Sequence, residues 1–344
     1  MLSNDEDIRL DVPLVYSQAP YCHIDSLAMI LRRLGDIYES WYMGCMSGQF
    51  FGLGYFPKPN FIKLSFGNYP LGCLLTFLEE HGYFYQLDEG KRWKEAFPTL
   101  KKFLKNNTPV LIISHMGWLS YNKEYEIFRS IGGVVDHYVV VAGYRDDEVV
   151  YVNDPHPDWH KKDAELPISD FKVGWEEKLE EIQSIRCPML VVIKRKTKPD
   201  VRKILVQALK RALINLNTKI GDRGIAGLRK ACKEIPEILR RNDPSIKNTL
   251  GEWAFFSFRL SEQNRKDIAK FLSYAAGELN LEKLKEAASS MVDASECYGN
   301  LRRIFRETLE NEIQTSRIAD DVETFLSRAY ENEKQCIKIM ETVL

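Results

Sequence analysis

The sequence predicts an α+β first part followed by an all-α second part. Up to about Lys196, helix, strand and loop patterns alternate, and beyond Pro199 the strand patterns end. Apolar residues then recur at helical spacing through the long stretches 200–216, 281–305 and 318–340. In the first part, four runs rich in valine and isoleucine predict strands. These runs are residues 109–114, 137–144, 148–154 and 188–195. We therefore expect one domain over 1–197 and a helical bundle domain over 198–344.

Composition and charge narrow the class of protein. The chain has 344 residues, enough for two domains, and its 44% hydrophobic and 28% charged residues are typical of a soluble globular protein. A net charge of −1 gives no general attraction to nucleic acid or to an anionic membrane. The acidic opening, MLSNDEDIRLDV, lacks the order of a signal peptide, and no apolar run approaches the roughly 18 residues that a membrane span requires. The seven cysteines form no Cys-x-x-Cys pair, a pattern that suits reduced thiols. We expect a cytoplasmic protein with neither nucleic-acid nor membrane partners.

The first predicted helix begins with a cysteine. Gly35 closes this helix in the usual C-terminal position, and Cys22 stands where it begins. The apolar stripe that predicts the helix consists of Ile24, Leu27, Ala28, Ile30, Leu31 and Leu34. The partial positive charge at a helix N-terminus favours thiolate and lowers the pKa of a thiol there. The alternative is that Cys22 is a buried small apolar side chain.

The strands at 137–144 and 148–154 are joined by the short sequence RDDE and predict a hairpin. The first strand is apolar on both faces, so we expect it in the middle of a sheet. His137 opens this strand, and Asp154 closes the next one. Because the start of one antiparallel strand lies beside the end of its neighbour, we expect His137 and Asp154 within hydrogen-bond distance.

Cys22, His137 and Asp154 together form a candidate catalytic triad. A cysteine at a helix start acts as nucleophile, a histidine as base, and a carboxylate orients the imidazole and stabilises its charged form. The order Cys, His, Asp along the chain is that of papain-like enzymes, in which an antiparallel sheet packs on the helix that carries the nucleophile. We therefore predict a papain-like catalytic domain over 1–197. The alternatives are a hydrogen-bonded core histidine at His137 and a turn residue at Asp154.

Other residues are candidates for contacts with the substrate. The backbone N–H of Cys22 and the side-chain amide of Gln18 are candidate oxyanion donors, although Gln18 is also compatible with a solvent-exposed loop. Residues 41–66 are rich in aromatics, glycine and proline, and we expect this segment and residues 114–130 to contact the substrate. Within 114–130, His115 and Trp118 are candidate substrate-binding residues.

We interpret His23 and the histidines of residues 154–160 as structural rather than catalytic or metal-binding. His23 follows Cys22 and is expected on a different helix face, in a structural or rim position. The sequence DPHPDWH, residues 154–160, carries four possible metal ligands. Its two prolines predict an irregular surface loop, so we expect no metal site there.

Five sequence motifs, spread over nearly the whole chain, resemble those of a known family. In the first half these are YCHIDSLAMILRRLG, PVLIISHMGWLSY and, most specifically, DHYVVVAGYRDDEVVYVNDP. In the second half they are GIAGLRKACKEIPEIL and FRLSEQNRKDIAKFLSYAA. With them, the chain resembles the butirosin biosynthesis protein H-like family, which is related to the papain-like bacteriocin-leader cysteine peptidases. It departs from that family where EWAFFSFR replaces a glycine-rich approach to the FR dipeptide.

The resemblance implies an acyltransferase of specialised metabolism, such as antibiotic biosynthesis. Such an enzyme moves an acyl or peptidyl group from the phosphopantetheine thioester of a carrier protein to a small amine. Cys22 would carry the group as a thioester, and His137, oriented by Asp154, would transfer the protons. No cofactor is implied other than the phosphopantetheine of the partner protein. Apart from the resemblance, basic clusters at 194–196, 210–211, 240–241 and 302–303 are either solvated helix faces or a docking site for an acidic carrier protein, and the helical domain could equally form a lid or a homodimer interface.

Two alternatives remain open at this stage. One is a cysteine peptidase or amidase that uses the same three residues. The other is a non-catalytic binding module in which the helical half carries the function.

Overall fold

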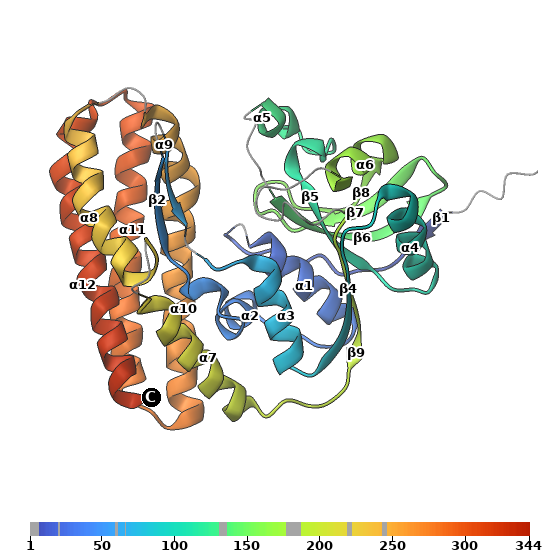
Figure 1. Cartoon of the computed structure of the whole chain (residues 1–344), viewed down its shortest axis with the longest axis horizontal. Coiled ribbons are helices and arrows are strands. Elements are labelled where there is room, and N and C mark those ends of the chain that lie inside the picture. Colours follow the sequence, from blue (N-terminus) through green and yellow to red (C-terminus); the bar gives the residue numbers. More distant parts are fainter. Residues whose placement is uncertain are drawn as a thin grey trace, which may run out of the picture. The chain divides into compact units, whose positions relative to one another are not determined.

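The structure is a computed structural model that describes residues 7–19, 21–58, 61–65, 67–130, 136–176, 187–218, 222–242 and 246–344 (Figure 1). Its chain divides into two compact units, and each unit combines two stretches of sequence. The first contains Met1–Ser40 and Leu74–Pro199, and the second contains Trp41–Cys73 and Asp200–Leu344. The predicted class, α+β with an antiparallel sheet followed by a helical region, is confirmed.

A seven-stranded antiparallel sheet forms the centre of the first unit. Its strands follow the order β4-β9-β5-β6-β7-β8, and β1 also pairs with β6. The strands are β1 (Asp7–Arg9), β4 (Tyr83–Asp88), β5 (Val110–His115), β6 (Asp136–Arg145), β7 (Val149–Asp154), β8 (Lys161–Pro167) and β9 (Met189–Arg195). Four of these strands, β5, β6, β7 and β9, were predicted from their valine- and isoleucine-rich runs. The short or more polar strands β1, β4 and β8 were not.

Strand β6 lies inside the sheet, as its two apolar faces predict. It pairs with β7 along one edge and with β5 and then β1 along the other. Val140 lies opposite Asn153 of β7, and Ser114 of β5 lies opposite His137. Val139, Val140 and Val141 are fully buried. The strand therefore holds His137 in a fixed place at its N-terminal end.

Helix α1 (Cys22–Arg33) packs on this sheet. Its apolar stripe is buried as far as Leu31, whereas Leu34 at the C-cap is exposed. The Ser26 hydroxyl donates a hydrogen bond of 2.9 Å to the Tyr138 carbonyl of β6. After the last turn, Gly35 adopts a φ of +90° and its N–H bonds to the Arg32 carbonyl, while the N–H of Asp36 bonds to the Leu31 carbonyl. This is the Schellman arrangement that Gly35 predicts.

Four α-helices and one 3₁₀ turn complete the described part of the first unit. These are α3 (Pro70–Glu80), which continues from the second unit, α4 (Trp93–Lys105), η2 (Met116–Trp118), α5 (Tyr125–Ser130) and α6 (Ile168–Glu176). Helix α6 approaches β5 and η2 closely at Gly174. A Cβ at that glycine would lie 2.7 Å from Ser114 Oγ and 2.8 Å from Trp118 Cβ. A larger residue there would push α6 away from the end of β5.

The second unit is a helical bundle that carries a small β-hairpin (Figure 1). Its long helices are α7 (Val201–Leu216), α8 (Gly224–Arg240), α10 (Phe258–Leu279), α11 (Leu284–Glu310) and α12 (Ala319–Val343). Shorter elements are α2 (Ser40–Met46), η1 (Gln49–Phe51), β2 (Gly54–Lys58), β3 (Phe61–Ser65), α9 (Lys247–Glu252), η6 (Thr315–Arg317) and the π-helical turn η5 (Trp253–Ser257). Within the described residues, no helix combines the length and apolar character that a membrane crossing needs.

Residues 41–73 group with the helices, although the sequence boundary at 197/198 assigns them to the first domain. The reason is the β2–β3 hairpin, whose side chains Tyr55, Ile62 and Leu64 are buried in the same apolar core as the helices. The Trp253 indole donates to the Ile62 carbonyl at 3.1 Å, and the Ser257 hydroxyl donates to the Leu64 carbonyl at 2.6 Å. Phe66 and residues 59–60 of the predicted substrate-contacting segment lie outside the described residues.

A buried ion pair and a tyrosine hydroxyl bound to it join three helices of the second unit. The Arg265 guanidinium on α10 donates two hydrogen bonds, of 2.9 and 3.0 Å, to the Glu333 carboxylate on α12. The Tyr298 hydroxyl on α11 donates to the same carboxylate at 2.6 Å. All three side chains are at most 1% exposed. A buried charge pair of this kind depends on keeping both partners, because a single charge left behind is strongly unfavourable.

Candidate active site

Cys22 is the first residue of α1, and its side chain is partly exposed. The chain leading to it is held by Asp25 in the first turn of the same helix. Asp25 accepts hydrogen bonds from the backbone N–H and the hydroxyl of Ser17, at 2.8 and 2.7 Å, and another from the Ser40 hydroxyl. Burial raises the pKa of Asp25 to about 6, although these hydrogen bonds oppose the shift. These hydrogen bonds hold Ser17, in the loop before Cys22, against the first turn of α1.

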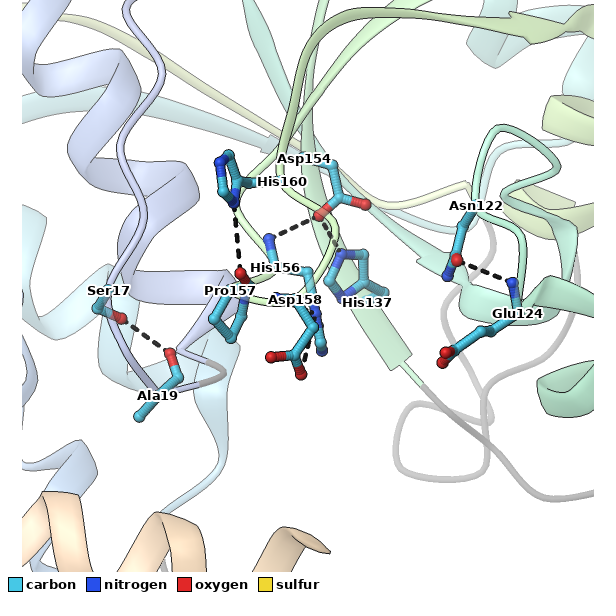
Figure 2. Close-up of polar contacts among 10 residues, drawn as sticks. All are labelled: Ser17, Ala19, Asn122, Glu124, His137, Asp154, His156, Pro157, Asp158 and His160. Carbon is cyan, nitrogen blue, oxygen red and sulfur yellow. Dashed lines mark hydrogen bonds and ion pairs between the residues drawn. The ribbon is translucent and has the colours of Figure 1, made fainter.

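His137 and Asp154 lie together at one end of the β6–β7 hairpin. Continuing the register of Val140 with Asn153 by one residue places Asp154 opposite Val139. His137 shares a strand face with Val139 and is therefore the diagonal neighbour of Asp154. The distance between His137 Nε2 and Asp154 Oδ1 is 2.8 Å (Figure 2). Both side chains are almost completely buried, at 1% and 0% exposure.

The Asp154 carboxylate accepts two more hydrogen bonds. The backbone N–H of His156 donates to Oδ1 at 2.8 Å, as Figure 2 also shows, and the Tyr121 hydroxyl donates to Oδ2 at 2.7 Å. Burial alone would raise the pKa of Asp154, but the charge of His137 and these hydrogen bonds lower it below its ordinary value. Asp154 therefore stays ionised beside the imidazole.

The Cys22 thiol and the His137 imidazole lie close enough for each to shift the pKa of the other. Because Nε2 is bound to Asp154, Nδ1 is the ring nitrogen left for the thiol. Burial raises the pKa of Cys22, but the charge and hydrogen bond of His137, helped by His23, bring it down to about 6. Burial lowers the pKa of His137, but the charges of Asp154 and then of Cys22 outweigh this effect and raise it to about 10. Between these values the pair is thiolate and imidazolium.

His23, expected on a different helix face from Cys22 in a structural or rim position, is buried rather than at a rim. Its proximity helps to lower the pKa of the Cys22 thiol. Its ring meets Tyr138 edge to face, with 5.6 Å between the centroids.

The structure places Gln18 in the loop before Cys22, with an exposed side chain. The backbone N–H of Cys22 lies in the first turn of α1, where N–H groups have no partner within the helix. The oxyanion roles of this N–H and of Gln18 remain predictions.

The structure places His115 and Trp118 at the end of β5, next to the strand that carries His137. His115 lies opposite Asp136, and its Nδ1 accepts a hydrogen bond of 3.0 Å from the Gly117 N–H. The Arg129 guanidinium stacks over Trp118, 3.6 Å from the ring centroid. Both residues thus have defined structural contacts, and their roles in substrate binding remain predictions.

The loop after Asp154 is held by aromatic stacking. The rings of His156 and Trp159 stack with centroids 3.3 Å apart, and those of His160 and Tyr16 stack at 3.8 Å. Among the described residues, no group of three or more His, Cys, Asp or Glu side chains is arranged to hold a metal ion.

The structure brings Cys22, His137 and Asp154 to the junction of a helix and an antiparallel sheet, as the sequence predicts for a papain-like enzyme, and their catalytic roles remain predictions. Residues 9–180, half of the 344-residue chain, match the family described as the Peptidase_C39 like family. The chain belongs to this family, and the match supports a papain-like cysteine enzyme. A search of curated proteins found no match to the chain.

Proposed function

We propose that this protein is a cysteine-dependent acyl or peptidyl transferase of specialised metabolism. It forms an amide from a carrier-protein phosphopantetheine thioester and a small amine. The observation that carries the proposal is the arrangement of the partly exposed Cys22 with the buried His137 and Asp154, in which the pKa of the thiol is lowered to about 6. The choice of a thioester donor and an amine acceptor rests on the resemblance of both halves of the sequence to the butirosin biosynthesis protein H-like family.

In the first step, the Cys22 thiolate attacks the carbonyl carbon of the donor thioester. The tetrahedral intermediate collapses with cleavage of the bond between carbon and pantetheine sulfur. The His137 imidazolium gives its proton to the departing thiolate, which leaves an acyl-Cys22 thioester and a neutral imidazole. One thioester replaces another, so this step is close to thermoneutral.

In the second step, the amine attacks the acyl-Cys22 carbonyl and the neutral His137 accepts a proton from its nitrogen. Collapse of this intermediate releases the amide and restores the thiolate and the imidazolium. Asp154 stabilises the charged imidazole in both steps. The Cys22 N–H at the start of α1, with Gln18 as the candidate second donor, stabilises each oxyanion. Water competes with the amine, so the amine must be held close to the acyl carbon.

The proposal requires an acyl or peptidyl carrier protein and an amine as partners, with no cofactor beyond the carrier's phosphopantetheine. The helical unit is proposed to have one of three roles. It docks the carrier, covers the cleft or forms a homodimer. A cytoplasmic setting is likewise proposed.

A cysteine peptidase or amidase is the second candidate function, because the matched family takes its description from a peptidase. The same three residues serve either chemistry. Transfer and hydrolysis differ in whether an amine or water discharges the acyl enzyme. A non-catalytic binding module has less support, since binding alone does not require a thiol that is ionised at neutral pH.

Intact-protein mass spectrometry tests these functions. The protein is mixed with acyl-pantetheine and acyl-carrier thioesters, and the wild type is compared with Cys22→Ala. The matched control is Cys232→Ala, which removes the other partly exposed thiol. We expect an acyl adduct in the wild type and in Cys232→Ala but none in Cys22→Ala, with discharge onto an added amine. Discharge to water alone would favour a hydrolase, and peptide cleavage without an adduct from thioesters would favour a peptidase.

A further inference from the structure

Tyr121 is a fourth residue at the candidate triad, and it contacts the part of Asp154 that His137 does not use. The hydrogen bonds from His137 Nε2 and from the His156 N–H both end on Asp154 Oδ1. The Tyr121 hydroxyl donates to Oδ2 at 2.7 Å. Asp154 is fully buried, so water does not replace this donor easily. Tyr121 thus binds the oxygen of the Asp154 carboxylate that His137 does not contact.

The backbone around Tyr121 is itself tied down on both sides. The Ser120 hydroxyl donates to Asp170 on α6 at 2.6 Å, and Lys161 Nζ on β8 donates to the Tyr121 carbonyl at 3.0 Å. The side-chain oxygen of Asn122 accepts the Glu124 N–H at 2.9 Å, which closes the following turn (Figure 2). The phenol is therefore presented to Asp154 by a segment that is fixed before any substrate binds.

We infer that Tyr121 is a positioning residue, which acts through Asp154 by fixing the carboxylate so that Oδ1 faces the His137 imidazole. This inference rests on the triad of the proposed function. Tyr121 itself touches neither the thiol nor the reacting atoms in this scheme. Its effect on chemistry must pass through the orientation of Asp154.

Loss of the hydroxyl has two physical consequences. Oδ2 becomes a buried acceptor without its donor, and the carboxylate is free to rotate about the Cβ–Cγ bond toward other donors. Rotation weakens the contact of Oδ1 with His137 and lowers the stability of the imidazolium. The thiolate then loses part of its partner charge, and the pKa of Cys22 rises.

The test measures the rate of Cys22 alkylation by iodoacetamide between pH 4.5 and 9. This range reports Cys22, since Cys232 is the other partly exposed thiol and burial raises its pKa to about 12. The wild type, Tyr121→Phe, Asp154→Ala and the double variant form a double-mutant cycle. Tyr125→Phe is the matched control, because its hydroxyl donates to the exposed neighbouring residue Glu126, at 3.3 Å.

We expect Tyr121→Phe to move the acid limb of the alkylation profile upward by about half to one pH unit, the size expected for one hydrogen bond. The same substitution should cause no further shift in the Asp154→Ala background. Tyr125→Phe should follow the wild-type profile. An unchanged profile in Tyr121→Phe would overturn the inference, as would an equal shift in the absence of Asp154.

Two features keep the result interpretable. If Asp154→Ala fails to fold, His137→Ala supplies the second background, because without the imidazole Tyr121 has no route to the thiol. The alkylation assay uses neither thioester nor amine. Failure of the proposed acyl transfer would therefore leave this test intact, and failure of the test would leave the choice between transferase and hydrolase open.

Discussion

The surroundings of each thiol determine its chemistry at the residue scale. Burial raises the pKa of Cys73 and of Cys232 to about 12. Burial also disfavours the Cys22 thiolate, but two imidazoles outweigh that effect and the pKa of Cys22 falls to about 6. Cys22 is therefore ionised at neutral pH where those two thiols are not. The same side chain is inert in an apolar setting and nucleophilic beside a cation.

The two imidazoles should contribute unequally to this ionisation. In the wild type, alkylation of Cys22 should increase as the pH rises through about 6, because the thiolate replaces the thiol above that value. His137→Ala should move this midpoint upward more than His23→Ala, since the charge of His137 is the larger stabilising influence. The measurement is the alkylation rate against pH, with Cys22→Ala as the blank. Equal shifts in the two variants would contradict this ranking.

The sequence indicated Cys22, His137 and Asp154 because each stands at the boundary of a predicted helix or strand. Tyr121 carried no such signal. It lies 33 residues from Asp154 in an irregular segment, and only the folded chain brings the two side chains together.

At the scale of elements, β1 depends on one glycine. Gly143 of β6 lies opposite Arg9, and a Cβ at Gly143 would come within 1.9 Å of the Ile8 carbonyl oxygen. After β1 the chain continues to Val12, whose carbonyl accepts the Asn153 side-chain amide at 3.0 Å. The strand thus anchors the segment that leads to Cys22.

Gly143→Ala should detach β1 from β6, because the added methyl group overlaps backbone rather than a movable side chain. We expect a loss of about 1–3 kcal/mol in the free energy of unfolding, measured by urea denaturation. The control is Gly277→Ala in α10, where no atom lies within 4 Å of an added Cβ. That variant should gain about 0.5–1 kcal/mol. A stable Gly143→Ala protein would show that β1 does not need this close approach.

At the scale of the whole molecule, the two units are interleaved in sequence. The hairpin of residues 54–65 lies between parts of the first unit along the chain, yet its apolar side chains belong to the core of the helical unit. Cutting the chain at the composition boundary would therefore separate the hairpin from its packing partners.

A fragment of residues 1–197 should consequently self-associate. Tyr55, Ile62 and Leu64 would lose their cover, and each exposed side chain costs about 1.5–3 kcal/mol relative to burial. Size-exclusion chromatography with light scattering measures the outcome against the full-length chain. The matched control is the same fragment with all three residues changed to serine, which we expect to be monomeric. A monomeric unsubstituted fragment would contradict the interleaved arrangement.

The sequence by itself determined the α+β order of the chain, the central hairpin, the cysteine at the start of a helix and the placement of His137 and Asp154. Each of these follows from local periodicity, turn chemistry and the period-2 alternation of strands, which neighbouring residues encode. The tertiary structure alone decided that the hairpin of residues 54–65 packs with the helices and that Tyr121 holds Asp154. These contacts join segments far apart in sequence, and no periodic signal specifies which of their side chains meet.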